Sequence, residues 1–231
     1  MFFDMKYILM VMIPGLILSG GASLLVRAAF SRYSQVRSRR GFTGAQAAQR
    51  LLDMAGIQDV RVVPAHGYLT DHYNPQTKEL ALSEEVYSSN SLAAVGVACH
   101  EAGHAIQHAE HYAPLGLRSA IVPMAGIGSN VGYMVMAFGL FIHPFVVGIG
   151  ALIFSAVLLF QLVTLPVEFD ATARAKALVV QAGIVDPDER YGIDRTLNAA
   201  ALTYVAAVIT TLLTILYYLM RAGLIGGSRD E

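Results

Sequence analysis

The sequence contains long stretches without charged side chains, separated by segments in which polar and apolar residues mix. The longest such stretch runs for 49 residues between Arg118 and Glu168. A helix needs about 20 mostly apolar residues to cross the hydrocarbon core of a bilayer, so this stretch has room for two crossings, with a reversal at His143 and Pro144. One more stretch lies near each end of the chain. The pattern therefore predicts four transmembrane helices, at about 7–26, 119–141, 145–166 and 197–220.

The first apolar stretch could also be a secretory signal peptide. Its apolar part is longer than the roughly 7–15 residues that such a signal uses, and no clear small-residue cleavage site follows it. We therefore expect this stretch to remain as a membrane anchor.

Two segments, 27–118 and 167–196, have the mixed pattern of aqueous regions. In the first of them, Thr43 is followed three residues later by Gln46, which is the signature of a capping box at a helix N-terminus. Gly56 suits the end of the same helix, because glycine readily adopts the left-handed conformation that closes a helix. We expect a helix between these signals.

Short β-rich runs at 61–64 and 79–83 are separated by the turn-forming residues DHYNPQT. They predict a small antiparallel sheet, with a further helix beginning near residue 84. The run at 79–83, ELALS, could be an edge strand that pairs with an extended substrate, or it could be a plain core strand.

Basic residues gather on one side of the predicted membrane topology. Thirteen of the sixteen Lys and Arg residues fall within 27–118 and 168–195. Since basic residues resist translocation, both segments are predicted to be cytoplasmic. The basic stretch Ser31–Arg40 either lies on anionic lipid headgroups or is a solvated linker.

Composition agrees with a membrane location. The chain is 55% hydrophobic and 14% charged, with a mean hydropathy of +0.52, whereas about a quarter of the residues are charged in a typical soluble domain. The net charge of −1 gives no reason to expect a nucleic-acid partner. The single cysteine, Cys99, excludes an internal disulfide and a cysteine-based zinc site, and we expect it to be a small core residue.

The motif HEAGH places two histidines four residues apart. On a helix, His100 and His104 lie on one face about 6 Å from each other, where both imidazoles can bind one zinc ion. Glu101 lies about 100° round the helix, so it can hold a water molecule at the metal without binding the metal itself. An HExxH pattern arises by chance in roughly one such sequence in a hundred. The alternative is a polar helix face with ordinary hydrogen-bonded histidines.

A catalytic zinc ion usually has a third protein ligand. His108 and His111 lie too far along the helix, and we expect them to be surface or supporting residues. Glu168 is the first charge after the longest apolar stretch, where a carboxylate needs a partner, and Pro166 is expected to break or redirect the helix just before it. Asp170 is the competing candidate, as a ligand or as a residue that orients a histidine.

Asp170 also has an ordinary interpretation. Arg174 follows it by four residues, so the two could form an ion pair on the surface of one helix.

Five blocks of the sequence resemble one known family. They are TGAQAAQRLLDMAGIQDV, GYLTDHYNPQTKELALS, AVGVACHEAGHAIQH, LPVEFDATARA and LNAAALTYVAA, from about Thr43 to Ala207. They look like successive blocks of the YugP-type neutral zinc metallopeptidases, which are bacterial membrane proteins.

The resemblance implies a zinc-dependent peptidase in which His100 and His104 are metal ligands, Glu101 is the catalytic residue, and a glutamate, matching Glu168, is the third ligand. In similar peptidases an aspartate often follows this glutamate by four residues. Here Thr172 holds that position, which weakens an orienting role for Asp170.

These observations predict a mainly α, polytopic membrane protein with about four transmembrane helices and a zincin-like α+β membrane-surface domain with a small sheet. We expect residues 1–231 to form a single membrane-embedded domain in a bacterial inner membrane. The expected activity is hydrolysis of peptides or membrane proteins by water activated at Zn²⁺. The alternatives are a non-catalytic scaffold that retains zinc and an intramembrane protease of the site-2 type.

Peptide hydrolysis also needs a hydrogen-bond donor for the oxyanion of the tetrahedral intermediate. His72, Tyr73 and Tyr191 are candidates by residue type only, and nothing in their spacing selects one of them.

Overall fold

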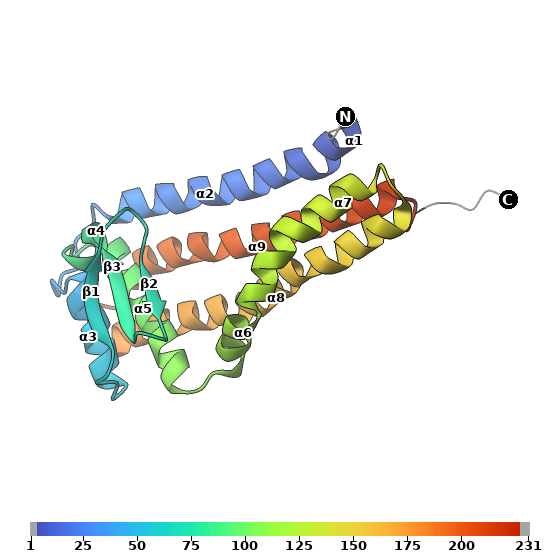
Figure 1. Cartoon of the computed structure of the whole chain (residues 1–231). Helices are drawn as coiled ribbons and strands as arrows, with labels where there is room; N and C mark the ends of the chain where they lie inside the picture. The colour runs from blue at the N-terminus through green and yellow to red at the C-terminus, as the bar shows by residue number, and fades with distance from the viewer. Residues whose placement is uncertain (1–3, 227–231) are drawn as a thin grey trace. The chain divides into compact units, whose positions relative to one another are not determined.

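The structure, a computed structural model, describes residues 4–226 and is mainly helical (Figure 1). Four of the described helical runs are long and apolar enough to cross a membrane: Met5–Tyr33, Ala113–Gly139, Pro144–Gln181 and Arg190–Arg221. These runs give four candidate spans by length and composition, as predicted; three of them extend beyond both predicted ends, and the second ends at Gly139, before the predicted end at residue 141.

Two of the four runs contain a short π-helical turn. The first run comprises α1 (Met5–Tyr7), the turn Ile8–Met12 and α2 (Ile13–Tyr33). The second comprises α6 (Ala113–Ile127), the turn Gly128–Gly132 and α7 (Tyr133–Gly139). The other two are the single helices α8 (Pro144–Gln181) and α9 (Arg190–Arg221). The chain reverses between α7 and α8, as predicted, and His143 Nδ1 accepts a hydrogen bond from the Phe145 amide at 3.1 Å.

Of the two expected effects of Pro166, a break or a redirection of the helix, the break is wrong, because α8 continues through this residue to Gln181. The redirection remains a prediction. A proline inside a helix removes one backbone hydrogen bond, and the other bonds of a long helix can hold it together across the gap. Glu168 is therefore a helical residue with a fixed direction, and residues 167–181 are not part of a loop.

The chain divides into two compact units. Of the described residues, the span unit contains 4–22, 117–165 and 203–226. The site unit contains Ser23–Gly116 and Pro166–Leu202. A single domain over the whole chain remains a prediction.

The site unit contains a three-stranded mixed sheet (Figure 1). Its strands are β1 (Arg61–Ala65), β2 (His72–Asn74) and β3 (Glu79–Ser83), in the order β1-β3-β2. β3 pairs in parallel with β1 and antiparallel with β2. The prediction of an antiparallel sheet is wrong, because the residues expected to form only a turn contain β2.

The edge-strand interpretation of ELALS is wrong as well. β3 lies between the other two strands, and its Leu80 and Leu82 are fully buried. An extended substrate that paired with this sheet would therefore have to use β1 or β2.

Helices pack around this sheet to form the core of the site unit. Helix α3 (Gly44–Met54) begins with the predicted capping box of Thr43 and Gln46, and Gly56 follows its end with a φ of 71°. The short helix α4 (Glu84–Tyr87) leads to α5 (Leu92–Ala109), which carries HEAGH. Cys99 is fully buried in this core, as predicted, and burial raises the pKa of its thiol.

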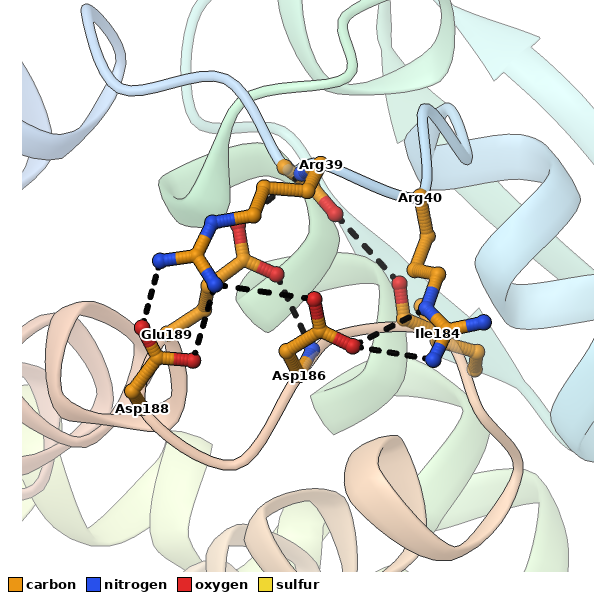
Figure 2. A network of polar contacts seen from close by, with 7 residues as sticks. Arg39, Arg40, Ile184, Asp186, Asp188 and Glu189 are labelled. Atoms are coloured by element: carbon orange, nitrogen blue, oxygen red, sulfur yellow. Dashed lines mark hydrogen bonds and ion pairs between the residues drawn. The ribbon is translucent and has the colours of Figure 1, made fainter.

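A network of ion pairs joins residues 38–40 to residues 184–189 within the site unit (Figure 2). Arg39 pairs with Asp188, and Arg40 Nε donates to Asp186 Oδ1 at 3.0 Å. The Arg39 amide donates to Glu189 Oε1 at 2.9 Å. Arg39 and Arg40, which belong to the basic stretch Ser31–Arg40, are thus paired with carboxylates of the same unit.

Candidate metal centre

Helix α5 brings the two histidines of HEAGH onto one face. Ser91 caps the helix by accepting a hydrogen bond from the Ala94 amide at 3.2 Å. Further along the helix, the rings of His100 and His104 lie with their centroids 4.7 Å apart and nearly perpendicular to each other. The two rings thus lie close together on one face of the helix, as the spacing of four residues predicts.

Helix α8 places Glu168 against both rings. Glu168 Oε2 lies 3.2 Å from His100 Nε2 and 3.5 Å from His104 Nε2. One ligand atom from each of the three residues lies within 4.8 Å of the others. Only 3% of the Glu168 side chain is exposed, so this carboxylate faces the histidines rather than solvent.

The chemistry and spacing of this group fit a zinc ion. Zinc binds imidazole nitrogen and carboxylate oxygen at about 2.0–2.2 Å, so neighbouring ligand atoms of a tetrahedral site are about 3.3–3.6 Å apart. The two separations from Glu168 Oε2 are close to this range. His100, His104 and Glu168 could therefore hold a metal ion with three protein ligands and one open position.

Two carboxylates give the centre a negative field. Burial of His104 disfavours its charged form, but the hydrogen bond to Glu168 and the charges of Glu101 and Glu168 outweigh that effect and raise its pKa above the ordinary value. Glu101 is itself buried on α5. A field that stabilises an imidazolium also favours a divalent cation at the same place.

Gln107 determines which nitrogen of His104 is available. Its amide nitrogen donates to the Val167 carbonyl and to Asp170 Oδ2, both at 2.8 Å. Its Oε1, an acceptor, lies 3.0 Å from His104 Nδ1. Because a carbonyl oxygen can only accept, Nδ1 must carry a proton, and in the neutral ring the lone pair is on Nε2, which faces Glu168.

Thr172 occupies the corresponding position beside the other histidine. Its Oγ1 lies 3.3 Å from His100 Nδ1. Thr172 follows Glu168 by four residues, so one face of α8 presents both side chains to α5. The threonine hydroxyl thus stands where similar peptidases often have an aspartate.

Asp170 contacts neither histidine of the group directly. Its Oδ2 accepts from Gln107 and, at 2.6 Å, from Arg174 Nε. The i,i+4 ion pair that the sequence offers as the ordinary interpretation is confirmed. Asp170 therefore acts on His104 only through Gln107.

The other predicted candidates make contacts outside this group. His72 Nδ1 lies 2.8 Å from the Thr70 carbonyl, and Tyr191 accepts a hydrogen bond from Arg195 Nε at 2.9 Å. Tyr73 pairs with His108 Nδ1 at 2.8 Å, on the side of α5 that faces β2.

His111 lies just after the end of α5 with a φ of 54°. These positions leave the donor for the oxyanion unassigned.

Replacing Gln107 by Leu should weaken zinc binding by about 10–100-fold, the usual effect of losing a residue that orients a metal-binding histidine. The change removes the acceptor for His104 Nδ1, so the ring and its tautomer are no longer fixed. Zinc competition with a chromophoric chelator measures the effect. Gln49→Leu is the matched control, because Gln49 is exposed and bonds to Asp53 on α3. Equal affinity in both variants would contradict the orienting role.

Gly103 allows α5 and α8 to approach closely. A Cβ at this position would lie 2.9 Å from the Ala171 carbonyl oxygen, which is backbone and cannot move aside easily. Gly103→Ala should therefore lower the free energy of unfolding by about 1–3 kcal/mol, as is typical of overpacking. Thermal unfolding in detergent measures the loss. Gly116→Ala is the control, since its Cβ would meet nothing within 4 Å, and an equal loss there would contradict the account.

Comparison with known proteins agrees with this geometry. A family model described as "Putative neutral zinc metallopeptidase" matches residues 8–223. The protein "Putative membrane protease YugP" of Bacillus subtilis (strain 168) is 44% identical over 209 residues, which cover 90% of this chain and 93% of that protein. No solved structure matches the chain.

Proposed function

The chain belongs to the family described as "Putative neutral zinc metallopeptidase", and on that premise we propose that it hydrolyses peptide bonds at a zinc ion held by His100, His104 and Glu168. The observation that carries this proposal is the convergence of the three side chains. Glu168 lies 64 residues after His104, and yet its carboxylate lies between the two imidazoles within the site unit. An ordinary polar helix face would not need a buried carboxylate from another helix.

We assign Glu101 as the catalytic base. When bound, zinc supplies a Lewis acid for the scissile carbonyl and makes a nearby water more acidic. Glu101 follows His100 directly on α5, so its carboxylate points beside the ligand face rather than along it. There it takes the proton from the attacking water and returns it to the leaving amine. Its buried position keeps this proton exchange away from bulk solvent.

Partners on the far side of each ring orient His104 and His100 toward the proposed metal position. Gln107 accepts from His104 Nδ1, and Thr172 lies within hydrogen-bond distance of His100 Nδ1. In the neutral form of His104 the proton on Nδ1 leaves Nε2 free to bind a metal. Thr172 can orient the ring of His100 but does not fix its tautomer, because a hydroxyl can donate as well as accept.

The proposed location is a bacterial plasma membrane, with the site at the cytoplasmic surface. The excess of basic residues in 27–118 and 168–195 supports this orientation. Among the described residues, α5 is not one of the four helices that could cross a membrane. This argues against the site-2 type, whose HExxH motif lies inside a span.

A cleavage assay in proteoliposomes made with ¹⁸O-labelled water tests this function. Unstructured peptides and membrane-protein fragments serve as substrates, and mass spectrometry reads the products. Hydrolysis predicts fragments with one ¹⁸O atom in each new carboxyl terminus, and a zinc chelator should abolish them. Bound zinc without labelled products from any substrate would favour the scaffold alternative.

Zinc affinity should increase with pH. The pKa of His104 is raised in the metal-free site, so below this pKa zinc must displace a proton, and above it the imidazole is already neutral. Between pH 6 and pH 8 the apparent affinity should rise by up to about tenfold per pH unit for each proton displaced. Zinc titration at constant ionic strength measures the slope. A flat profile over this range would mean that zinc binding displaces no proton from a histidine.

A further inference from the structure

A groove of about 640 Å³ lies in the site unit between the last turns of α2 and the first turns of α9. Its apolar lining includes Leu25 on α2 and Leu202 on α9. Its polar lining includes Arg32 on α2 and Arg195 on α9. The volume is in the range that small ligands occupy in proteins.

The two walls repeat the same order of side chains. Leu25 and Arg32 are seven positions apart, and so are Arg195 and Leu202, which is about 10 Å along each helix. Arg32 lies next to the end of α2, and Arg195 lies near the start of α9. Both walls thus change from apolar to cationic toward the ends of helices that could cross a membrane. An amphiphile with an anionic head has the complementary order.

The two guanidinium groups are not neutralised within the described residues 4–226. Arg195 Nε donates to the Tyr191 hydroxyl and its guanidinium lies 5.1 Å from the centre of that ring. Arg32 lies 5.7 Å from the centre of the Tyr33 ring. Neither forms an ion pair with a carboxylate in this part of the chain.

Asp194, the acidic residue of the lining, pairs with Arg190 instead, at 3.3 Å.

This arrangement differs from that of Arg39 and Arg40, whose charges are paired with Asp186 and Asp188 (Figure 2). Arginine presents a planar set of donors that suits a phosphate group. Tyrosines are common at the depth of lipid headgroups, and basic pockets between spanning helices bind anionic lipid heads. We therefore propose that this groove binds one anionic phospholipid, with its phosphate at Arg32 and Arg195 and an acyl chain along Leu25 and Leu202.

The wall of the groove also packs on the helix of the metal centre. A Cβ on Gly192 would lie 2.8 Å from the Tyr33 ring and 2.9 Å from Leu92 Cδ1. One residue further, Ile193 packs against Gly96, four residues before His100. A lipid that holds α2 and α9 together therefore stabilises the unit that carries α5.

The test uses the purified full chain in neutral detergent and follows thermal unfolding and native mass spectra during lipid titration. Short-chain phosphatidylglycerol should raise the unfolding temperature and remain bound as one molecule, whereas phosphatidylcholine with the same acyl chains should do neither. In the double variant Arg32→Gln/Arg195→Gln the affinity for phosphatidylglycerol should fall at least about tenfold, because each charged hydrogen bond to the phosphate is lost. The matched control is Arg27→Gln/Arg37→Gln, which removes the same charge from exposed residues outside the groove and should keep the wild-type affinity.

A second variant keeps both cations and fills the groove. Ala28 is an exposed residue of the lining, and Ala28→Trp should also lose phosphatidylglycerol binding. Three results would overturn the proposal: equal binding of phosphatidylcholine, equal stabilisation by glycerol 3-phosphate alone, or equal loss in the control variant. The first would indicate an apolar groove without headgroup selection, the second a site for soluble phosphate compounds, and the third a general effect of charge.

Discussion

Glu168→Gln should reduce zinc affinity by more than about 100-fold, because loss of a direct ligand should exceed the 10–100-fold effect of losing a supporting residue. The substitution keeps the shape of a buried side chain and removes the charge that lies 3.2 Å and 3.5 Å from the two imidazoles. Two neutral histidines alone then remain for the metal. Elemental analysis after dialysis against a chelator of known affinity measures the change.

Asp170→Asn is the matched control for this substitution. Asp170 lies on the same helix, two residues away, but its contacts are Gln107 and Arg174. Zinc should remain bound in this variant, with an affinity reduced by at most about tenfold. If Asp170→Asn lost the metal and Glu168→Gln kept it, the ligand assignment would be wrong.

Glu101→Gln should lower the cleavage rate by about 10²–10⁴-fold, the usual contribution of a positioned acid–base group. Zinc should stay bound at the wild-type stoichiometry, since the amide changes no ligand. The measurement combines zinc content and initial rate on one preparation. Glu85→Gln provides the control, because Glu85 is exposed on α4 and should keep the wild-type rate.

The same variant separates the enzyme from a scaffold that retains zinc. A structural zinc site has no use for a base at position 101, so a scaffold would keep both its zinc and its cellular role after Glu101→Gln. Undiminished cleavage in this variant would show that another group takes the proton from water.

Much of the fold could be predicted because hydrophobic length is a strong signal. Stretches of about 20 apolar residues have few alternatives to a spanning helix, and each of the four predicted spans overlaps a helical run that could cross a membrane. The capping box at Thr43 and Gln46 could also be predicted, since it depends only on neighbours in the sequence. Features that depend only on residues close together in the sequence could thus be predicted.

The sheet and the course of α8 could not be predicted in the same way. Strand β2 is only three residues long and overlaps a turn-forming sequence, so its pairing with β3 has no local signature. The effect of Pro166 depends on the helix around it, which continues to Gln181. For β2 the pairing with a distant strand overrides a local preference, and for Pro166 the surrounding turns of α8 do so.

The candidate site was predictable in part. The spacing of His100 and His104 requires one helix face, and the isolation of Glu168 in an apolar sequence indicates a partner for its charge. Gln107 and Thr172 have no such signal by residue type. Their only available signal was spacing, since Gln107 follows His104 by three residues and Thr172 follows Glu168 by four.

The account depends most directly on zinc-dependent peptide cleavage, which a titration of metal into the metal-free protein tests. Cleavage should be absent without zinc, should rise in proportion to the zinc added, and should stop rising at one zinc ion per chain. Cleavage by the metal-free protein, or a rate that does not follow zinc occupancy, would contradict the account.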